Sequence, residues 1–236
     1  MSVNEITTLQ FGNYSNHIST HYWNFHLKRL LEKENLTEDN QNYLNKLFRE
    51  STSSRNRYVP RTICFDIKTK LQSLKKDGSF EMLEEQTSLI PDEEENVMMY
   101  TEPSYEKNDF LKQVQSGDFE ADKKNQVDFE SEVKSWSDYM MFELDDHSIQ
   151  LLTETYKDGE DFSFFALGQN EYDSLFDDFE DNLHFWAEEC DYMEGFQVLV
   201  KMIETYIIYY VFIFGNIYGR GYIYCTLIFI AITPTK

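Results

Sequence analysis

Residues 5–23, EITTLQFGNYSNHISTHYW, give the clearest indication of the fold. Residues 5–11 are rich in β-branched and apolar side chains, which predicts a short strand. Gly12 to Asn16 is a polar turn, and apolar residues then recur at the spacing of an amphipathic helix as far as Leu31. A strand, a Gly/Asn turn and a helix open many nucleotide-binding folds, because the helix N-terminus offers free N–H groups to phosphate. Any βα unit needs a similar turn, so this pattern alone indicates only an α/β fold.

A second strand is expected at Thr62–Ile67, introduced by Pro60. Its almost continuous apolar character predicts a strand that is covered on both faces. Asp66 stands near its carboxyl end, where α/β sheets place groups that contact ligands. Further elements are expected as helices at 39–50, around 133–142 and at 183–192, as a short strand or turn at 148–152, and as a turn and buried strand at 195–200.

The composition is strongly acidic. The 43 Asp and Glu outnumber the 21 Lys and Arg, which gives a formal net charge of −22. This charge argues against general nucleic-acid binding, because the phosphate backbone attracts basic surfaces. The three cysteines, Cys64, Cys190 and Cys225, form no CxxC pair or zinc-ligand spacing, so a reducing compartment is expected. The first residues do not have the composition of a secretory or transit peptide.

Two stretches carry unusual charge. Residues 77–132 combine an acidic run with few apolar positions, which predicts a long surface insertion, part of it disordered. Residues 158–194 hold thirteen Asp or Glu, interleaved phenylalanines and not one Lys or Arg. Two interpretations of this second stretch remain open: an amphipathic helix with a solvated acidic face, or a docking site for a basic partner.

The tail, residues 200–236, changes character abruptly. Its apolar blocks at 206–214 and 222–232 are each too short for a membrane helix, and a span built from both would hold Arg220 near its middle. One hypothesis is that the tail comes from intron read-through or a truncated isoform, and the alternative is a genuine membrane tail. With an aberrant tail the sheet would expose an unpaired strand edge.

Three segments, 9–23, 58–67 and 189–198, are similar to the first strand and nucleotide loop of tubulin, to the strand before its second loop, and to the helix and strand before its glycine-rich loop. The sequence resembles the Misato family of tubulin-related proteins more closely still. The resemblance rests on residues 8–24 (TLQFGNYSNHISTHYWN), 58–74 (YVPRTICFDIKTKLQSL), 136–139 (WSDY) and 183–199 (LHFWAEECDYMEGFQVL). It implies that residues 1–199 are the N-terminal portion of a tubulin/FtsZ-like, Rossmann-type nucleotide-binding domain of α/β class, with the long acidic insertion described above.

The same resemblance allows the nucleotide chemistry to be checked. It implies that Gly12, Asn13, Asn16, His17 and Asp66 occupy vestigial nucleotide-loop positions, although for the first four a turn and helix cap retained for folding is the favoured interpretation over a nucleotide contact. Lys68 stands where tubulins carry an acid, and a lysine cannot hold Mg²⁺. No glycine-rich run follows Leu199. We therefore expect no catalytic residue, no metal site and no cofactor.

The family implies a non-enzymatic protein of mitochondrial distribution and morphology, in the cytoplasm and at the cytosolic face of the mitochondrial outer membrane. The partners it implies are tubulin, chaperonin or mitochondrial outer-membrane proteins, with no nucleic acid and at most peripheral membrane association. Two alternatives stay open. One is a nucleotide-binding GTPase of the tubulin superfamily. The other is a tubulin- or chaperonin-associated spindle-assembly factor that docks through residues 158–194.

Overall fold

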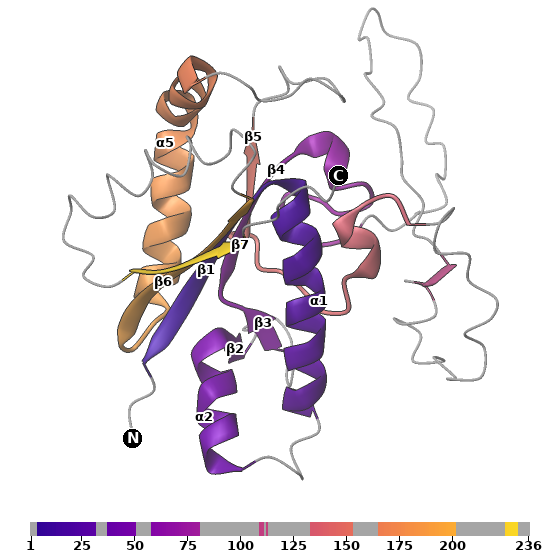
Figure 1. Ribbon diagram of the computed structural model, residues 1–236, viewed down its shortest axis with the longest axis vertical. Coiled ribbons are helices and arrows are strands. Elements are labelled where there is room, and N and C mark those ends of the chain that lie inside the picture. The colour runs from indigo at the N-terminus through magenta and orange to yellow at the C-terminus, as the bar shows by residue number, and fades with distance from the viewer. Residues whose placement is uncertain are drawn as a thin grey trace, which may run out of the picture.

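A computed structural model describes residues 4–31, 37–50, 58–80, 109–110, 112, 133–152, 165–201 and 225–230 of the chain. At the centre of this part of the chain lies a five-stranded sheet in the order β5-β4-β1-β6-β7 (Figure 1). Each neighbouring pair in it is parallel. The strands are β1 (Glu5–Phe11), β4 (Thr62–Ile67), β5 (Ile149–Leu152), β6 (Met193–Lys201) and β7 (Cys225–Ile230). The predicted α/β class is confirmed.

Strand β1 lies in the middle of the sheet because both of its edges are paired. Phe11 stands opposite Phe65 of β4 on one side and Val200 of β6 on the other. Alternate β1 residues, Leu9 and Phe11, point into one buried apolar cluster, as the two-residue period of a strand requires.

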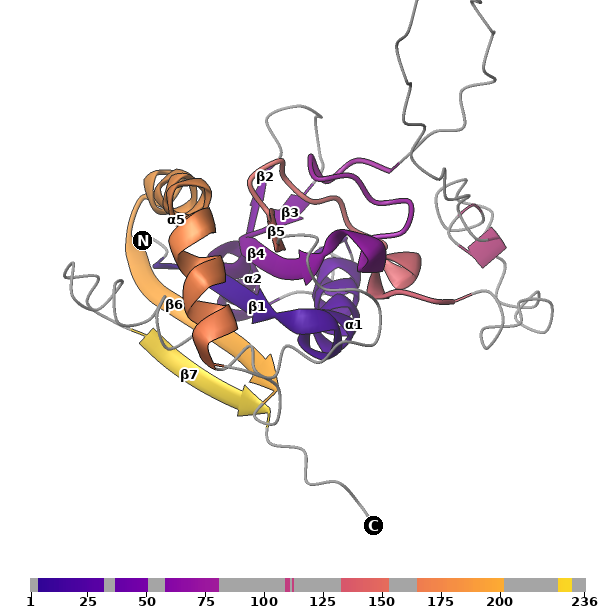
Figure 2. The ribbon, with the colours of Figure 1, turned by 90° about the horizontal axis from the view of Figure 1, so that it is seen from above.

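Helices cover both faces of the sheet, on opposite sides of it in Figure 2. On one face, Phe179, Leu183 and Trp186 of α5 (Phe165–Glu188) pack against Leu9, Phe11, Ile63, Phe65, Phe196, Val198 and Val200. On the other face lie α1 (Gly12–Leu31), α2 (Glu38–Leu47) and the segment around the 3-10 helix η4 (Trp136–Tyr139). This double coverage explains why β4 is almost continuously apolar.

Several expected boundaries were wrong. The polar residues Gly12 to Asn16 are not a separate turn, because α1 begins at Gly12 directly after β1. The helix expected at 39–50 ends at Leu47, and Phe48–Glu50 forms β2, which pairs antiparallel with β3 (Tyr58–Pro60). The side chains of Phe48 and Arg49 are buried in this two-stranded ribbon, so tertiary packing overrides the helical pattern there.

Two other helices also differ from expectation. The helix expected around 133–142 is only the four-residue η4, with extended backbone on either side. The helix expected at 183–192 is the last part of the 24-residue α5, which ends at Glu188. The acidic stretch 158–194 thus contains a helix, as predicted; of its first seven residues nothing is described.

The tail and the insertion are described only in part. Residues 225–230 of the tail form β7, which runs parallel to β6 and pairs with it from Phe196 to Lys201. The edge of β6 that was expected to be unpaired if the tail is aberrant is therefore paired with a strand from the tail. Most of the expected insertion, 81–108, 111 and 113–132, lies outside the described residues. In the part of the chain that is described, none of the helices has the length and apolar character needed to cross a membrane.

Candidate functional site

The carboxyl end of β1 turns directly into α1 at Gly12. Gly12 has a φ of 82°, in the left-handed region where an L side chain clashes with its own backbone. The change of direction brings the second turn of α1 over the end of β4. A glycine is required here for the path of the backbone, whatever else the loop does.

Asn16 and Asp66 are brought together at this edge of the sheet. The Asn16 side-chain nitrogen donates to Oδ2 of Asp66 at 2.9 Å and to the carbonyl oxygen of Phe65 at 3.2 Å. Asn16 is fully buried and Asp66 is 1% exposed. Asn16 lies inside α1, so it is not a helix cap; it ties the helix to the end of β4.

Trp136 supplies the next donor to the same carboxylate. Its indole N–H donates to Oδ2 of Asp66 at 2.9 Å, and the backbone N–H of Ile67 donates to Oδ1 at 2.9 Å. Asp66 thus accepts three hydrogen bonds from its own chain. The site prediction did not include Trp136, although Trp136 belongs to the WSDY segment that carried part of the family resemblance.

The segment around Trp136 is held in place by further polar contacts. Asp138 Oδ2 accepts from the backbone N–H groups of Lys134 and Ser135 and closes a capping box. Ser137 Oγ donates to the carbonyl of Leu71 at 2.9 Å. Asn24 of α1 donates to the carbonyl of Tyr139. The Trp136 indole is therefore positioned by contacts on both sides of it, with α1 and with the loop after β4.

Burial dominates the electrostatics of Asp66. Removal from water raises the pKa of its carboxyl group to about 6, even though the hydrogen bonds from Asn16, Ile67 and Trp136, and the charge of Lys70, act in the opposite direction. The group is an acid in a closed polar cage. Its side chain is not open to solvent, where a hydrated cation would reach it.

The other predicted positions do not join this cage through any described contact. His17 is half-buried with its ring centroid 6.0 Å from that of Tyr139, and burial lowers its pKa, with a further lowering from His21. Asn13 is half-buried, and its Oδ1 has no hydrogen-bond partner among the described residues. Of the five predicted positions, the structure joins Asn16 and Asp66 by a hydrogen bond. That all five are vestigial nucleotide-loop positions stays a prediction.

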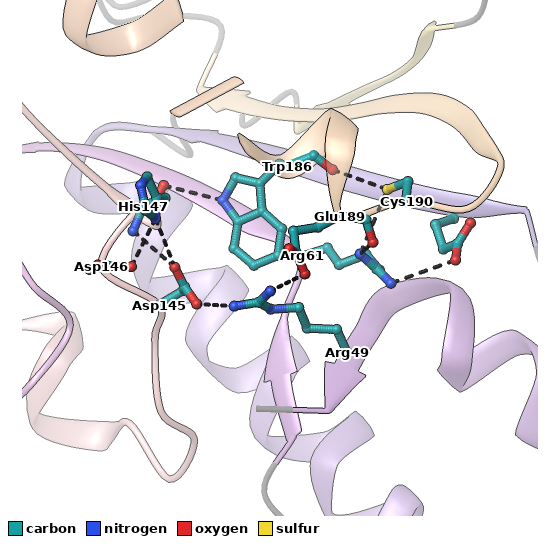
Figure 3. Close-up of polar contacts among 9 residues, drawn as sticks. Arg49, Arg61, Asp145, Asp146, His147, Trp186, Glu189 and Cys190 are labelled. Carbon is teal, nitrogen blue, oxygen red and sulfur yellow. Dashed lines mark hydrogen bonds and ion pairs between the residues drawn. The ribbon is translucent and has the colours of Figure 1, made fainter. Parts of the chain in front are cut away.

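A second polar cluster lies at the amino ends of the strands (Figure 3). Arg49 of β2 reaches two carboxylates with its two terminal nitrogens: Asp145, just before β5, and Glu189, just after α5. Its guanidinium also lies over the rings of Phe185 and Trp186, at 5.1 and 5.3 Å from their centroids. No local sequence pattern indicates this role of Arg49, because its two partners are 96 and 140 positions away.

Arg61, beside the start of β1, also bridges two acidic residues. Its guanidinium donates to the carbonyl of Glu189 at 2.8 Å and lies 3.6 Å from a carboxylate oxygen of Glu5. Glu5 in turn accepts from the backbone N–H of Tyr192. Both arginines contact Glu189, so they connect the end of α5 to β2 through Arg49 and to β1 through Arg61 and Glu5. We interpret this cluster as structural, because ligands of parallel α/β sheets bind at the opposite, carboxyl ends of the strands.

Asp145, Asp146 and His147 bring three possible metal-ligand atoms within 4.8 Å of one another. The Nδ1 atom of His147 lies 3.1 Å from Asp145 and 2.8 Å from Asp146. Asp145 already pairs with Arg49, whose charge opposes a cation at this point. The His147 ring stacks on Phe185 at 3.8 Å. These contacts give Asp145 and His147 a role in packing that needs no metal.

The parallel sheet, its helices on both faces and the helix that begins at Gly12 define the chain as a tubulin-like α/β domain. The family model of the Misato Segment II tubulin-like domain matches residues 4–116. The protein misato homolog 1 of Danio rerio is 30% identical over an alignment that covers 86% of this chain and 40% of the relative. That of Mus musculus is 28% identical, and the protein misato of Drosophila melanogaster 26%, with the same 86% of this chain covered.

The chain belongs to the Misato family, as its four anchor segments predicted. It spans about two fifths of the length of these curated relatives, since 39–40% of each relative is matched.

Proposed function

We propose that the protein is a non-enzymatic, tubulin-like organiser of mitochondrial distribution and morphology that works in the cytoplasm and at the cytosolic face of the mitochondrial outer membrane. The membership in the Misato family supports the tubulin-like part of this proposal. The observation that carries the non-enzymatic part is the state of Asp66, the one acid that the resemblance assigns to the nucleotide loops.

Asp66 has little capacity left for a metal–nucleotide complex. Both of its oxygens accept hydrogen bonds from the protein, and the indole of Trp136 lies against it. Mg²⁺ binding needs an ionised carboxylate that replaces water in a strict octahedral shell. To bind the ion, the chain would have to release Asn16 or Trp136 and leave a buried donor unpaired, at a cost of about 1–3 kcal/mol. Lys68, exposed on the turn after β4, adds a positive charge near that place.

A direct binding experiment tests the alternative of a GTPase. A fluorescent GTP analogue is titrated with the chain in Mg²⁺ and, separately, in EDTA. We expect no saturable signal in either buffer, and no difference between the wild type and a Trp136→Phe variant. Micromolar binding that requires Mg²⁺ would overturn the non-enzymatic proposal and favour the GTPase.

The cellular part of the proposal needs its own test. Cells depleted of the endogenous protein are examined for the distribution and shape of their mitochondria, and the chain is then supplied again. We expect depletion to give a clustered or fragmented network that the chain restores. A fluorescent fusion is expected in the cytoplasm and on mitochondria, and a normal network after depletion would remove the mitochondrial role.

A second candidate, a tubulin- or chaperonin-associated spindle-assembly factor, is favoured by the outer face of α5. Asp173, Asp177, Asp178 and Asp181 are exposed there, with no Lys or Arg on the helix. Purified tubulin and chaperonin are tested in a pull-down with the wild type and with an Asp177→Asn, Asp178→Asn, Asp181→Asn variant. Binding that the variant loses supports the second candidate, whereas binding that it keeps, or no binding, removes α5 as the docking surface.

A further inference from the structure

The outward face of α1 exposes apolar side chains that the sheet does not use. Phe25 is 58% exposed and Leu31 is 62% exposed, whereas Trp23 and Leu30 on the inner face are 1% exposed. The helix is therefore apolar on both sides, which a helix that only covers a sheet does not need. Figure 1 shows α1 between α2 and the segment that contains η4, with its outer face uncovered by either helix.

Both flanks of this face add apolar surface. On one side, the backbone N–H of Met141 donates to the side-chain oxygen of Asn24 at 2.9 Å, which holds the 43%-exposed Met141 beside α1. On the other side, Tyr43 of α2 lies within hydrogen-bond distance of the Tyr22 hydroxyl, at 3.2 Å, and is also partly exposed. Exposed apolar groups that are gathered in this way mark interaction sites more often than scattered ones do.

The charge of this face is opposite to that of the chain. Residues 12–31 contain no Asp or Glu, although the chain as a whole has a net charge of −22. Lys28 and Arg29 lie in the last turn of α1, and the Arg29 guanidinium lies over the ring of Phe25, 5.7 Å from its centroid. Basic residues in a last turn also suit the helix dipole. The dipole does not account for the exposure of Phe25 and Met141.

We propose that Phe25, Lys28, Arg29, Leu31 and Met141, here called the α1 patch, bind an acidic segment of a partner protein that carries apolar side chains. The apolar side chains of the partner would cover Phe25, Leu31 and Met141, and its carboxylates would pair with Lys28 and Arg29 in the charge-assisted geometry that guanidinium favours. An aromatic ring with an adjacent arginine is the combination that dominates the energetics of many protein interfaces.

An anionic membrane is a poorer fit to the same face. Segments that bind anionic lipids carry clusters of about four to eight Lys or Arg, and the α1 patch supplies two. The net charge of −22 repels an anionic lipid surface over the whole of the molecule. A short peptide segment meets the patch alone, because charges further away than about 8–10 Å are screened at physiological salt.

The test uses the whole chain and a fluorescein-labelled synthetic peptide, Glu-Asp-Phe-Glu-Glu-Leu-Phe-Asp, with fluorescence anisotropy as the readout. A control peptide carries Lys in place of each acid. We expect saturable binding of the acidic peptide that weakens as salt is raised, and binding at least about tenfold weaker for Phe25→Ser and for the double variant Lys28→Glu, Arg29→Glu. Tyr192→Ser removes a ring that is 60% exposed but lies at the start of β6, and should leave the affinity unchanged.

Three results would overturn the proposal: equal binding of the acidic and the lysine peptide, unchanged affinity in the Phe25 and charge-reversal variants, or no saturable binding. Vesicles of phosphatidylcholine with phosphatidylserine are tested by flotation beside the peptides. Flotation that depends on Lys28 and Arg29, without peptide binding, would replace the peptide by a membrane as the ligand. The three residues substituted in the patch lie on the surface of α1, so the variants are expected to fold. Circular dichroism of each variant verifies this.

Discussion

The indole N–H of Trp136 donates to Oδ2 of Asp66 across 70 positions of the sequence, at a distance of 2.9 Å. This contact joins η4 to the carboxyl end of β4. It places a fully buried aromatic ring beside the acid that a nucleotide loop would use. The proposal that the protein binds no Mg-nucleotide depends on this pair, and its energetic weight can be measured.

Replacement of Trp136 by Phe is expected to lower the free energy of unfolding by about 1.5–3 kcal/mol. The substitution removes one donor to a buried carboxylate, and hydrogen bonds to charged groups contribute about 1.5–3 kcal/mol. Urea denaturation measures the change. Trp23→Phe is the matched control, because Trp23 is equally buried but its indole N–H has no partner among the described residues. A loss as large in Trp23→Phe would show that ring volume, rather than the hydrogen bond, matters.

Asp66 gives the stability a pH dependence of unusual sign. Its pKa is raised by burial to about 6 in the folded chain and returns to 3.8 on unfolding. Below pH 3.8 both states are protonated. Between these values the folded state holds the extra proton, so the free energy of unfolding falls as pH rises from about 4 to 6, by up to about 3 kcal/mol from this group.

An Asp66→Asn variant isolates that contribution, because its side chain does not titrate. Urea melts at pH 4, 5, 6 and 7 should show the variant gaining stability relative to the wild type as pH rises through this window. The lowered pKa of Asp145 acts in the opposite direction in both proteins and cancels in the comparison. A constant difference between the two proteins would show that the pKa of Asp66 does not change on folding.

Arg49→Met is expected to destabilise the chain by about 3–5 kcal/mol. The substitution leaves Asp145, whose side chain is 12% exposed, without the arginine that pairs with it. Removal of one partner of a buried ion pair is strongly destabilising, because it leaves the other charge buried and uncompensated. Thermal and urea melts measure the loss. Lys46→Met removes a cation from an exposed pair with Glu194, where about 0–1 kcal/mol is expected. Similar losses in the two variants would contradict the conclusion that the ion pairs of Arg49 connect β2 to the end of α5.

Gly12→Ala is expected to cost about 1–2 kcal/mol, because an L side chain at a φ of 82° is strained. Gly12→Asn should cost less, since asparagine tolerates the left-handed region. Stability is measured by urea denaturation. An alanine variant that is as stable as the wild type would mean that the backbone of the β1–α1 junction relaxes away from this conformation.

Much of the fold was predictable from local pattern. The apolar runs of β1 and β4, the strand at 149–152 and the amphipathic part of 158–194 each follow from side-chain periodicity, which depends only on near neighbours. The predicted boundary at 39–50 failed at Phe48, because the pairing of Phe48 with Pro60 is a long-range contact. Arg49 was not predicted as a structural centre for the same reason.

The α/β class, the Misato family and the differences of the two loops from those of tubulin follow from the amino-acid sequence, because they depend on the types and order of neighbouring residues. The role of Asp66 depends on the tertiary structure. A carboxylate at the end of a strand is open or closed according to what packs on it, and here Asn16 and Trp136 reach it from 50 and 70 positions away. The β1–Gly12–α1 junction thus places the inner face of α1 against Asp66, in a closed polar cage. The outward face of the same helix stays exposed.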